Sequence, residues 1–293
     1  MATAADLFLG VDGGGTGCRV RLVDTTGRRL GEGKAGAANI RLGLDVSWGQ
    51  IQAATDQALA EAGLDRTALP RIHAGFGLAG ITGQADAVRV IGGASGFASL
   101  AVETDAHTAC LGAFGGRDGA ILILGTGSAG YAIVDGASHP IGGWGFEISD
   151  DASGAQLGRE ALRAAVRAYD GLAPRTLLTD AVMARLGGHP PDVVAWVDKA
   201  KPGDYGALAP MVLDHASQGD PVAMGLIREA IAHVDTFIRR LLDLGAGRVA
   251  LMGGLALVLE PWLDTSAREA LAKPEGDAMD GAVLLARHAV RTR

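Results

Sequence analysis

The sequence predicts an α/β protein in two halves, each with a mixed sheet that begins with a three-stranded meander. At 293 residues the chain exceeds the size at which one hydrophobic core stops growing, so two domains are expected. Strand and helix patterns interleave along the chain, which favours mixed sheets flanked by helices. Residues 7–34 and 120–143 also share one order of elements: strand, small-residue turn, strand, turn and strand. A chance similarity of two meanders is the alternative.

The first half opens with the meander LFLGVDGGGTGCRVRLVDTTGRRLGEGK, which turns at its glycine run and again at Thr26-Gly27. Strand and helix patterns then alternate up to a helix that is expected to begin near Thr108. We assign residues 1–115 to an N-terminal lobe. The predicted elements between are helices over residues 46–62 and 84–97 and strands over residues 71–80 and 99–106.

The second half opens with the meander AILILGTGSAGYAIVDGASHPIGG, whose second turn is Asp135-Gly136. It closes with a strand over residues 247–254 and a last helix over residues 277–290 that can pack back on the N-terminal lobe. We assign residues 116–293 to a C-terminal lobe and expect the binding site in a cleft between the lobes. Helical periodicity in this half covers residues 153–169, 176–187, 191–200, 204–217 and 220–244.

Composition excludes several classes of protein. Hydrophobic residues make up 48% and charged residues 20%, which is typical of a globular chain. The net charge is −7 with dispersed basic residues, so no nucleic-acid partner is expected. No apolar run approaches the roughly 20 residues of a membrane span, and MATAADLFLGVDGGG lacks an export signal, so we expect no membrane partner and a cytoplasmic location. Cys18 and Cys110 fit neither a metal spacing nor a disulfide framework.

Residues 125–130 (GTGSAG) match the dinucleotide fingerprint G-x-G-x-x-G. That fingerprint requires a helix directly after it, because the pyrophosphate rests on the helix N-terminus. Here the β-formers of YAIV and the Asp135-Gly136 turn follow instead, so a Rossmann site is disfavoured. No G-x-x-x-x-G-K-[ST] occurs, which excludes a P-loop.

Two glycine-rich hairpins, one in each half, are candidate phosphate sites. Glycines reach positive φ without strain and let anionic oxygens approach the backbone amides. Asp12 ends the first strand beside Gly13, Gly14 and Gly15, and its charge would repel a phosphate unless a cation such as Mg²⁺ lay between them. Thr16 can donate its hydroxyl to a phosphate. A simple type I′ turn is the alternative.

Five segments in order resemble the signatures of the sugar kinase/heat-shock-70/actin ATPase superfamily. They are DGGGT (12–16), TDAHTACLGA (104–113), GTGS (125–128), LMGGLA (251–256) and EGDAMDGAVLLA (275–286). Within it, the chain resembles the N-acetylglucosamine kinase and BadF/BadG/BcrA/BcrD ATPase branch, closest to the bacterial glucosamine kinases; AANI (37–40) and GGWGFEISDDASG (142–154) also match. The resemblance implies a two-lobed actin-like (ribonuclease H-like) fold, ATP and Mg²⁺ as ligands, transfer of the γ-phosphoryl to the 6-hydroxyl of an amino sugar, and a homodimer.

The resemblance also implies which residues hold the nucleotide. In similar kinases the first hairpin meets the β- and γ-phosphates, with the Asp12 carboxylate bound to Mg²⁺ through water. The second hairpin is the other phosphate loop, and Gly253-Gly254 lets the adenosine lie against the chain. The implied nucleotide-binding residues are Asp12, Gly13, Gly14, Gly15, Thr16, Gly125, Thr126, Gly127, Ser128, Gly253 and Gly254.

Asp105 matches the carboxylate that accepts the proton of the sugar hydroxyl in such kinases. With an ordinary pKa near 3.9 it would be ionised at neutral pH and ready for this role. The alternative is that Asp105 is the N-cap of the helix expected near Thr108, since Asp is a favoured cap.

By the same resemblance, Asn39 and Asp150 match residues that hydrogen-bond sugar hydroxyls. Glu147, Asp150 and Asp151 also place three carboxylates within five residues, and a surplus of negative charge would favour the ammonium of glucosamine over the acetamide of N-acetylglucosamine. An ordinary turn Asn, a helix cap and a solvated acidic turn are the alternatives.

Two other functions remain open at this point. One is an activator ATPase of the same branch, which holds an iron–sulfur cluster between subunits with two cysteines from each; Cys18 and Cys110 depart from the expected placement. The other is a nucleotide-dependent sensor or chaperone-like module without enzymatic activity, for which no partner-binding segment is visible.

Overall fold

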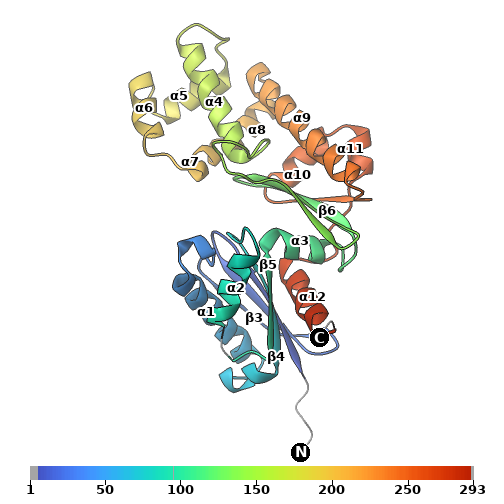
Figure 1. Ribbon diagram of the computed structural model, residues 1–293. Helices are drawn as coiled ribbons and strands as arrows, with labels where there is room; N and C mark the ends of the chain where they lie inside the picture. Colours follow the sequence, from blue (N-terminus) through green and yellow to red (C-terminus); the bar gives the residue numbers. More distant parts are fainter. Residues whose placement is uncertain (1–5, 95, 292–293) are drawn as a thin grey trace, which may run out of the picture. The chain divides into compact units, whose positions relative to one another are not determined.

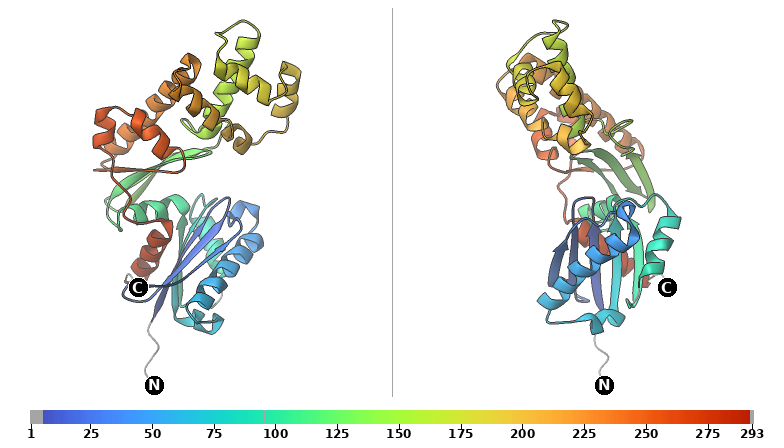
Figure 2. Two further views of the ribbon diagram at one scale, coloured as in Figure 1. Left: turned by 180° about the vertical axis from the view of Figure 1, so that it is seen from behind. Right: turned by 90° about the vertical axis from the view of Figure 1, so that its left-hand side faces the viewer.

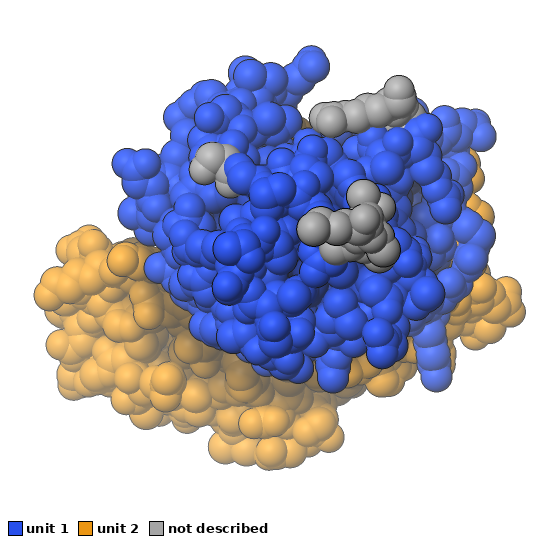
Figure 3. Space-filling view, turned by 90° about the horizontal axis from the view of Figure 1, so that it is seen from below, with its two compact units in different colours: residues 1–119, 133–138, 273–293 blue, residues 120–132, 139–272 orange. Residues whose placement is uncertain are grey.

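The computed structural model describes residues 6–94 and 96–291 (Figure 1). This part of the chain divides into two units, which Figure 3 colours separately. Unit 1 contains the described residues up to 119 together with 133–138 and 273–291, and unit 2 contains residues 120–132 and 139–272. Among the described residues, no helix combines the length and the apolar character of a membrane span.

Unit 1 is built on a five-stranded mixed sheet in the order β3-β2-β1-β4-β5. The first three strands are antiparallel neighbours and form the predicted meander, whereas β4 and β5 run parallel to β1. The strands are β1 (Leu7–Gly13), β2 (Cys18–Val23), β3 (Arg29–Ala35), β4 (Ile72–Leu78) and β5 (Ser99–Thr104).

Helices cover both faces of this sheet (Figures 1 and 2). Helix α1 packs on β3 and β2, while α12 packs on β1, β4 and α3. Successive residues of a strand point to opposite faces. Leu9 and Val11 share a buried cluster with α1, and Gly10 between them faces α12. The helices are α1 (Leu44–Glu61), α2 (Gln84–Gly93), α3 (Asp105–Ala113) and α12 (Ala278–Arg291), with 3₁₀ turns η1 (Ile40–Leu42) and η2 (Arg66–Arg71).

Close approach of α12 explains glycines that lie outside the predicted glycine-rich turns. A Cβ on Gly10 would lie 2.3 Å from the carbonyl oxygen of Met279, and one on Gly75 would lie 2.0 Å from that of Ala282. Larger side chains would therefore push the helix off the sheet. Arg21 of β2 also forms ion pairs with Asp277 and Asp280 at the start of α12.

Unit 2 contains most of a four-stranded sheet in the order β8-β7-β6-β9, in which β6 and β9 are parallel. The predicted turn between β7 and β8 is confirmed, because Asp135 and Gly136 have φ of 50° and 73°, as a type I′ hairpin turn requires. The strands are β6 (Gly119–Leu124), β7 (Ser128–Val134), β8 (Ala137–Gly142) and β9 (Val249–Met252).

The helices of unit 2 follow the predicted periodic segments with one clear exception. The segment 204–217 was expected to be one helix but forms parts of two, α7 and α8. The break precedes Pro210, which lacks an N–H and is favoured in the first turn of a helix. The short α10 and α11 were not predicted. The helices are α4 (Gly154–Tyr169), α5 (Leu177–Arg185), α6 (Pro190–Val197), α7 (Pro202–Gly206), α8 (Ala209–Ser217), α9 (Pro221–Asp243), α10 (Ala256–Leu259) and α11 (Thr265–Glu269), with a 3₁₀ turn η3 (Glu260–Trp262).

Candidate functional site

One edge of the unit 1 sheet gathers the predicted residues of the N-terminal half. Strands β1, β4 and β5 are parallel, and Gly13 pairs with Leu78, which pairs with Thr104. Their carboxyl ends therefore lie at the same edge, which is where open α/β sheets bind ligands. Asp12 and Asp105 come together at this edge.

The first hairpin leaves its backbone open at this edge. The Gly14 amide donates to the Gly17 carbonyl at 2.8 Å, and the Ala79 amide donates to the Gly13 carbonyl at 2.8 Å. A Cβ on Gly15 would meet nothing within 4 Å. Gly15 and Thr16 are both exposed, so anionic oxygens can reach this stretch of chain.

Asp12 is half-buried and forms an ion pair with Arg19, whose Nε lies 3.0 Å from Oδ2. The two residues face each other across the hairpin, because Asp12 pairs with Arg19 in the β1–β2 register. The sequence reasoning did not assign Arg19 to the site. The sequence could have identified Arg19, because an antiparallel pairing of the strands on either side of the glycine-rich turn places Arg19 opposite Asp12.

Asp105 is the first residue of α3, so this helix begins three residues earlier than expected. Its N-cap is Thr104, whose hydroxyl accepts a hydrogen bond from the His107 amide at 3.0 Å. The alternative that Asp105 is the cap is therefore wrong. The Asp105 carboxylate accepts a hydrogen bond from the Ala106 amide at 2.9 Å.

The pKa of Asp105 was expected to be ordinary, and this expectation is wrong. Burial raises the pKa of Asp105 above its usual value, and the charge of Asp12 raises it further. The hydrogen bond from Ala106 opposes this shift without cancelling it. A carboxylate with a raised pKa is a stronger base once it has lost its proton.

Asn39 lies at the same edge and caps the 3₁₀ turn η1. Its Oδ1 accepts a hydrogen bond from the Arg41 amide at 2.9 Å, and the Ile40 amide binds the Ala79 carbonyl at 3.1 Å. A Cβ on Gly80 would lie 2.4 Å from Oδ1 of Asn39. The capping hydrogen bond uses Oδ1 of Asn39 and does not involve its Nδ2 group.

In unit 2 the second hairpin and the Gly253-Gly254 loop leave one edge of the sheet, because β6 and β9 are parallel. The Gly125 amide donates to the Gly127 carbonyl at 2.9 Å, and the Leu255 amide donates to the Leu124 carbonyl at 3.0 Å. Gly253 has φ of 94°, and a Cβ there would lie 2.3 Å from the Leu124 oxygen. Only glycine fits this position.

A pocket of about 620 Å³ opens beside these two loops within unit 2. One end consists of small residues of the hairpin and of the start of α4, where the Gly154 amide donates to the Gly125 carbonyl at 2.8 Å. The other walls carry apolar side chains, which suit a flat aromatic base. The lining residues are Gly125, Thr126, Gly154, Gly206, Ala209, Pro210, Leu213, Asp214, Gly254, Leu255 and Val258.

The three carboxylates after the second hairpin occupy different environments. Glu147 is exposed and Asp150 is buried. Asp151 is half-buried, and its Oδ1 accepts a hydrogen bond from the side-chain Nε2 of Gln156 at 3.3 Å. No group of three His, Cys, Asp or Glu side chains in the described ranges could hold a metal ion. The N-cap of α4 is Ser153, so none of the three carboxylates caps that helix.

Asp150 is tied to the second hairpin. Burial raises the pKa of Asp150, while hydrogen bonds from the backbone amides of Ser128 and Gly145 stabilise its ionised form. A Cβ on Gly127 would lie 2.7 Å from Oδ2 of Asp150. The carboxylate therefore helps to fix the shape of the hairpin.

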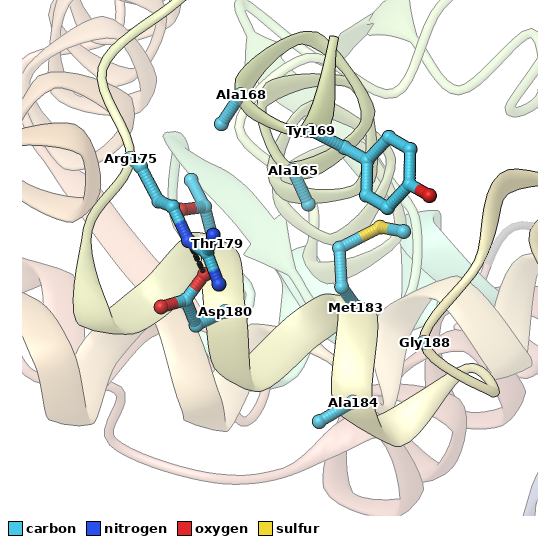
Figure 4. A pocket seen from close by; sticks show the side chains of 9 residues that line it. All are labelled: Ala165, Ala168, Tyr169, Arg175, Thr179, Asp180, Met183, Ala184 and Gly188. Atoms are coloured by element: carbon cyan, nitrogen blue, oxygen red, sulfur yellow. Dashed lines mark hydrogen bonds and ion pairs between the residues drawn. The ribbon is translucent and has the colours of Figure 1, made fainter. Parts of the chain in front are cut away.

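A second pocket, of about 440 Å³, lies between α4 and α5 (Figure 4). Arg175 and Asp180 face each other on one side of it, joined by an ion pair of 2.6 Å, and Tyr169 and Met183 lie on the other. The two charges neutralise each other, and we assign this pocket no role. Its lining residues are Ala165, Ala168, Tyr169, Arg175, Thr179, Asp180, Met183, Ala184 and Gly188.

Both cysteines are buried in unit 1. Cys18 lies on β2, and Cys110 lies on α3 with its Sγ 3.4 Å from the Gly119 carbonyl oxygen. Burial raises the pKa of each thiol to about 12. Neither is placed to share a cluster with another subunit, since such a site needs thiolates at the surface.

Comparisons with known proteins agree on the family. A model of the BadF/BadG/BcrA/BcrD ATPase family matches residues 9–286. The chain is 39% identical to the glucosamine kinase GspK of Vibrio cholerae over 279 residues, which cover 95% of each chain.

Solved structures agree on the fold. A structure from Chromobacterium violaceum, described as a candidate N-acetylglucosamine kinase, matches with a TM-score of 0.87 and 38% identity, covering 96% of this chain and 99% of that one. A ROK family glucokinase from Streptomyces griseus, solved with glucose and AMPPNP, matches with a TM-score of 0.55 and 21% identity over 97% of this chain and 99% of that one. The predicted two-lobed, actin-like α/β fold is therefore confirmed.

Proposed function

The chain belongs to the BadF/BadG/BcrA/BcrD ATPase family, and on that premise we propose that it transfers the γ-phosphoryl group of ATP to the 6-hydroxyl of an amino sugar. The 39% identity to a glucosamine kinase over 95% of both chains carries this proposal. We further propose that units 1 and 2 act as the two expected lobes. Unit 1 would supply Asp105 and Asn39 to the sugar, and unit 2 would supply the nucleoside pocket and the acidic residues of the acceptor site.

Asp105 is proposed as the base that takes the proton of the sugar hydroxyl. It lies at the carboxyl edge of the unit 1 sheet beside Asp12, and its raised pKa favours proton acceptance. Asn39 at the same edge is proposed to donate Nδ2 to a sugar hydroxyl. Both groups, the Asp105 carboxylate and the Asn39 Nδ2, lie at this edge of the unit 1 sheet.

The two hairpins are proposed to bind the phosphates, and Gly253-Gly254 the adenosine. The open backbone at Gly15, together with the pocket beside Gly125 and Gly254, supports this assignment. The assigned residues are Asp12, Gly13, Gly14, Gly15, Thr16, Gly125, Thr126, Gly127, Ser128, Gly253 and Gly254.

We propose that the unit 1 edge takes a divalent cation mainly through water, because among the described residues it offers carboxylates but no complete set of metal ligands. Asp12 and Asp105 repel each other there, and a cation would relieve that repulsion. We propose that Asp12 holds Mg²⁺ through water, exchanging its present bond to Arg19. When bound, Mg²⁺ supplies positive charge against the phosphate oxygens during transfer.

Glucosamine is the favoured acceptor. The relative with 39% identity is named a glucosamine kinase, whereas a relative from Dictyostelium discoideum with 25% identity is named an N-acetyl-D-glucosamine kinase. Glu147, Asp150 and Asp151 are proposed to line the acceptor site, with the exposed Glu147 available to an ammonium group.

We also propose a homodimer located in the cytoplasm. The dimer follows from the family resemblance, and the location from the sequence pattern alone. Sedimentation of the purified chain and fractionation of cells that express it would test these two points.

The iron–sulfur alternative has little support, because Cys18 and Cys110 are both buried. A sensor or chaperone-like module would bind and hydrolyse ATP without any sugar dependence. Both differ from a sugar kinase in properties that are simple to measure.

The test is an ADP-release assay with glucosamine, N-acetylglucosamine and glucose, run with Mg²⁺ and with a chelator. Release should depend on the metal, with the highest kcat/KM for glucosamine. Iron should be absent from the purified protein. ADP release that no sugar stimulates would reject the kinase assignment.

A further inference from the structure

We propose that Asp214 selects ribonucleotides by accepting hydrogen bonds from the 2′- and 3′-hydroxyls of the ribose in the pocket of unit 2. The inference rests on the nucleotide-binding part of the proposed function and does not depend on which sugar is phosphorylated. No motif in the sequence pointed to α8 as part of a site.

The pocket-facing side of α8 is defined by spacing. Ala209, Pro210, Leu213 and Asp214 all line the pocket, and their positions i, i+1, i+4 and i+5 share one face of a helix. Asp214 is exposed, so its carboxylate lies where a ligand can reach it.

Charge determines what Asp214 can bind. Of the eleven residues that line this pocket in the described structure, only Asp214 is charged. No donor in the described ranges hydrogen-bonds to its carboxylate, although its main-chain carbonyl accepts bonds from Ser217 and Gln218. An ionised carboxylate accepts hydrogen bonds and repels phosphate, so it should meet hydroxyl groups.

Distance separates Asp214 from the phosphate end of the pocket. Ala209 begins α8 beside Gly154: a Cβ added to Gly154 would lie 3.7 Å from the Cβ of Ala209. The Gly154 amide in turn donates to the Gly125 carbonyl of the second hairpin. Asp214 lies five residues further along, which is about 7.5 Å along the helix axis. A nucleotide with phosphates at the hairpin would place its ribose hydroxyls at about this offset.

The remaining walls suit the base. Pro210, Leu213, Leu255 and Val258 offer apolar surface, and Gly254 has open space where a Cβ would lie. The ribose is then the part of a nucleotide that carries two adjacent hydroxyl donors to the single carboxylate. A bidentate bond of this kind gives discrimination against nucleotides that lack either hydroxyl.

The experiment compares binding of ADP, 2′-deoxy-ADP and 3′-deoxy-ADP by calorimetry in three proteins: the wild type, Asp214→Asn and Asp198→Asn. Asp198 is also an exposed Asp but lines none of the pockets described above, so it is the matched control. We expect the wild type and Asp198→Asn to bind each deoxy analogue about tenfold more weakly than ADP. Asp214→Asn should bind ADP about tenfold more weakly and lose most of the discrimination.

Two results would overturn the proposal: equal affinities of the wild type for all three nucleotides, or unchanged discrimination in Asp214→Asn. An equal loss of affinity for all three nucleotides is a case of the second result, since the carboxylate would then act on the whole pocket. A chain that binds no ADP at all would instead reject the proposed function. Thermal unfolding of Asp214→Asn checks that the variant is folded.

Discussion

Burial raises the pKa of Asp105, and the charge of Asp12, at the carboxyl end of the sheet's central strand, raises it further. Two carboxylates are thus kept close together although their repulsion costs free energy. Such an arrangement is expected where a cation and a proton transfer are needed.

Asp105→Asn should lower kcat by about 100-fold or more, because Asn cannot accept the proton of the sugar hydroxyl. The KM for ATP should change little, since the proposed nucleotide contacts lie elsewhere. Steady-state ADP release with glucosamine measures both quantities. Full turnover by this variant would reject Asp105 as the base.

The same variant should be more stable than the wild type at neutral pH. A carboxyl group whose native pKa is raised binds more protons in the native state, so its contribution to stability falls as the pH rises from the usual value of 3.8 through the native pKa. Asn keeps the Oδ1 acceptor for the Ala106 amide and carries no charge. The Tm of the variant should therefore exceed that of the wild type at pH 7, with a smaller difference near pH 4. Equal pH dependence of Tm in both proteins would contradict the raised pKa.

Gly253→Ala should lower the stability of the protein, whereas Gly254→Ala should lower its affinity for ADP. A Cβ at Gly253 collides with the Leu124 carbonyl and requires a left-handed backbone, so the loss of stability should be on the order of 3 kcal/mol. A Cβ at Gly254 meets nothing within 4 Å, so stability should hold while the affinity for ADP falls. Denaturant unfolding and calorimetry separate the two effects, and similar unfolding curves for the two variants would contradict this account.

Neither cysteine should react with a thiol reagent in the native protein at pH 8. Burial raises the pKa of Cys18 and Cys110 to about 12, so little thiolate forms, and both sulfurs are shielded. Two thiols should titrate rapidly after addition of denaturant. Rapid native labelling of either residue would reopen the metal-cluster alternative.

The sequence predicted the elements whose patterns are local. Both meanders and the Asp135-Gly136 turn follow from strand patterns and turn residues, and the family resemblance singled out Asp12, Asn39 and Asp105 one by one. It did not predict features that depend on packing between distant segments. The sequence places Gly10 within a strand but does not show why this position needs a glycine. The reason is the close packing of α12 against it.

The sequence also did not predict the pKa of Asp105, the residue that caps α3 or the burial of individual carboxylates. The raised pKa of Asp105 depends on burial and on Asp12, which is 93 residues away in the chain. Only Asp105 was weighed as a cap, whereas Thr104, one position earlier, is the N-cap in the structure. Similarly, the clustering of three acidic residues did not indicate which of them faces inward, and the fold buries Asp150 and leaves Glu147 exposed.

Helix α12 completes the core of unit 1 although its residues follow all of unit 2 in the chain. During synthesis, the strands around Gly10 and Gly75 therefore leave the ribosome long before the helix that covers one of their faces. One face of this sheet therefore stays exposed while unit 2 is synthesised. During this period the nascent N-terminal segment is most susceptible to aggregation and most accessible to chaperones.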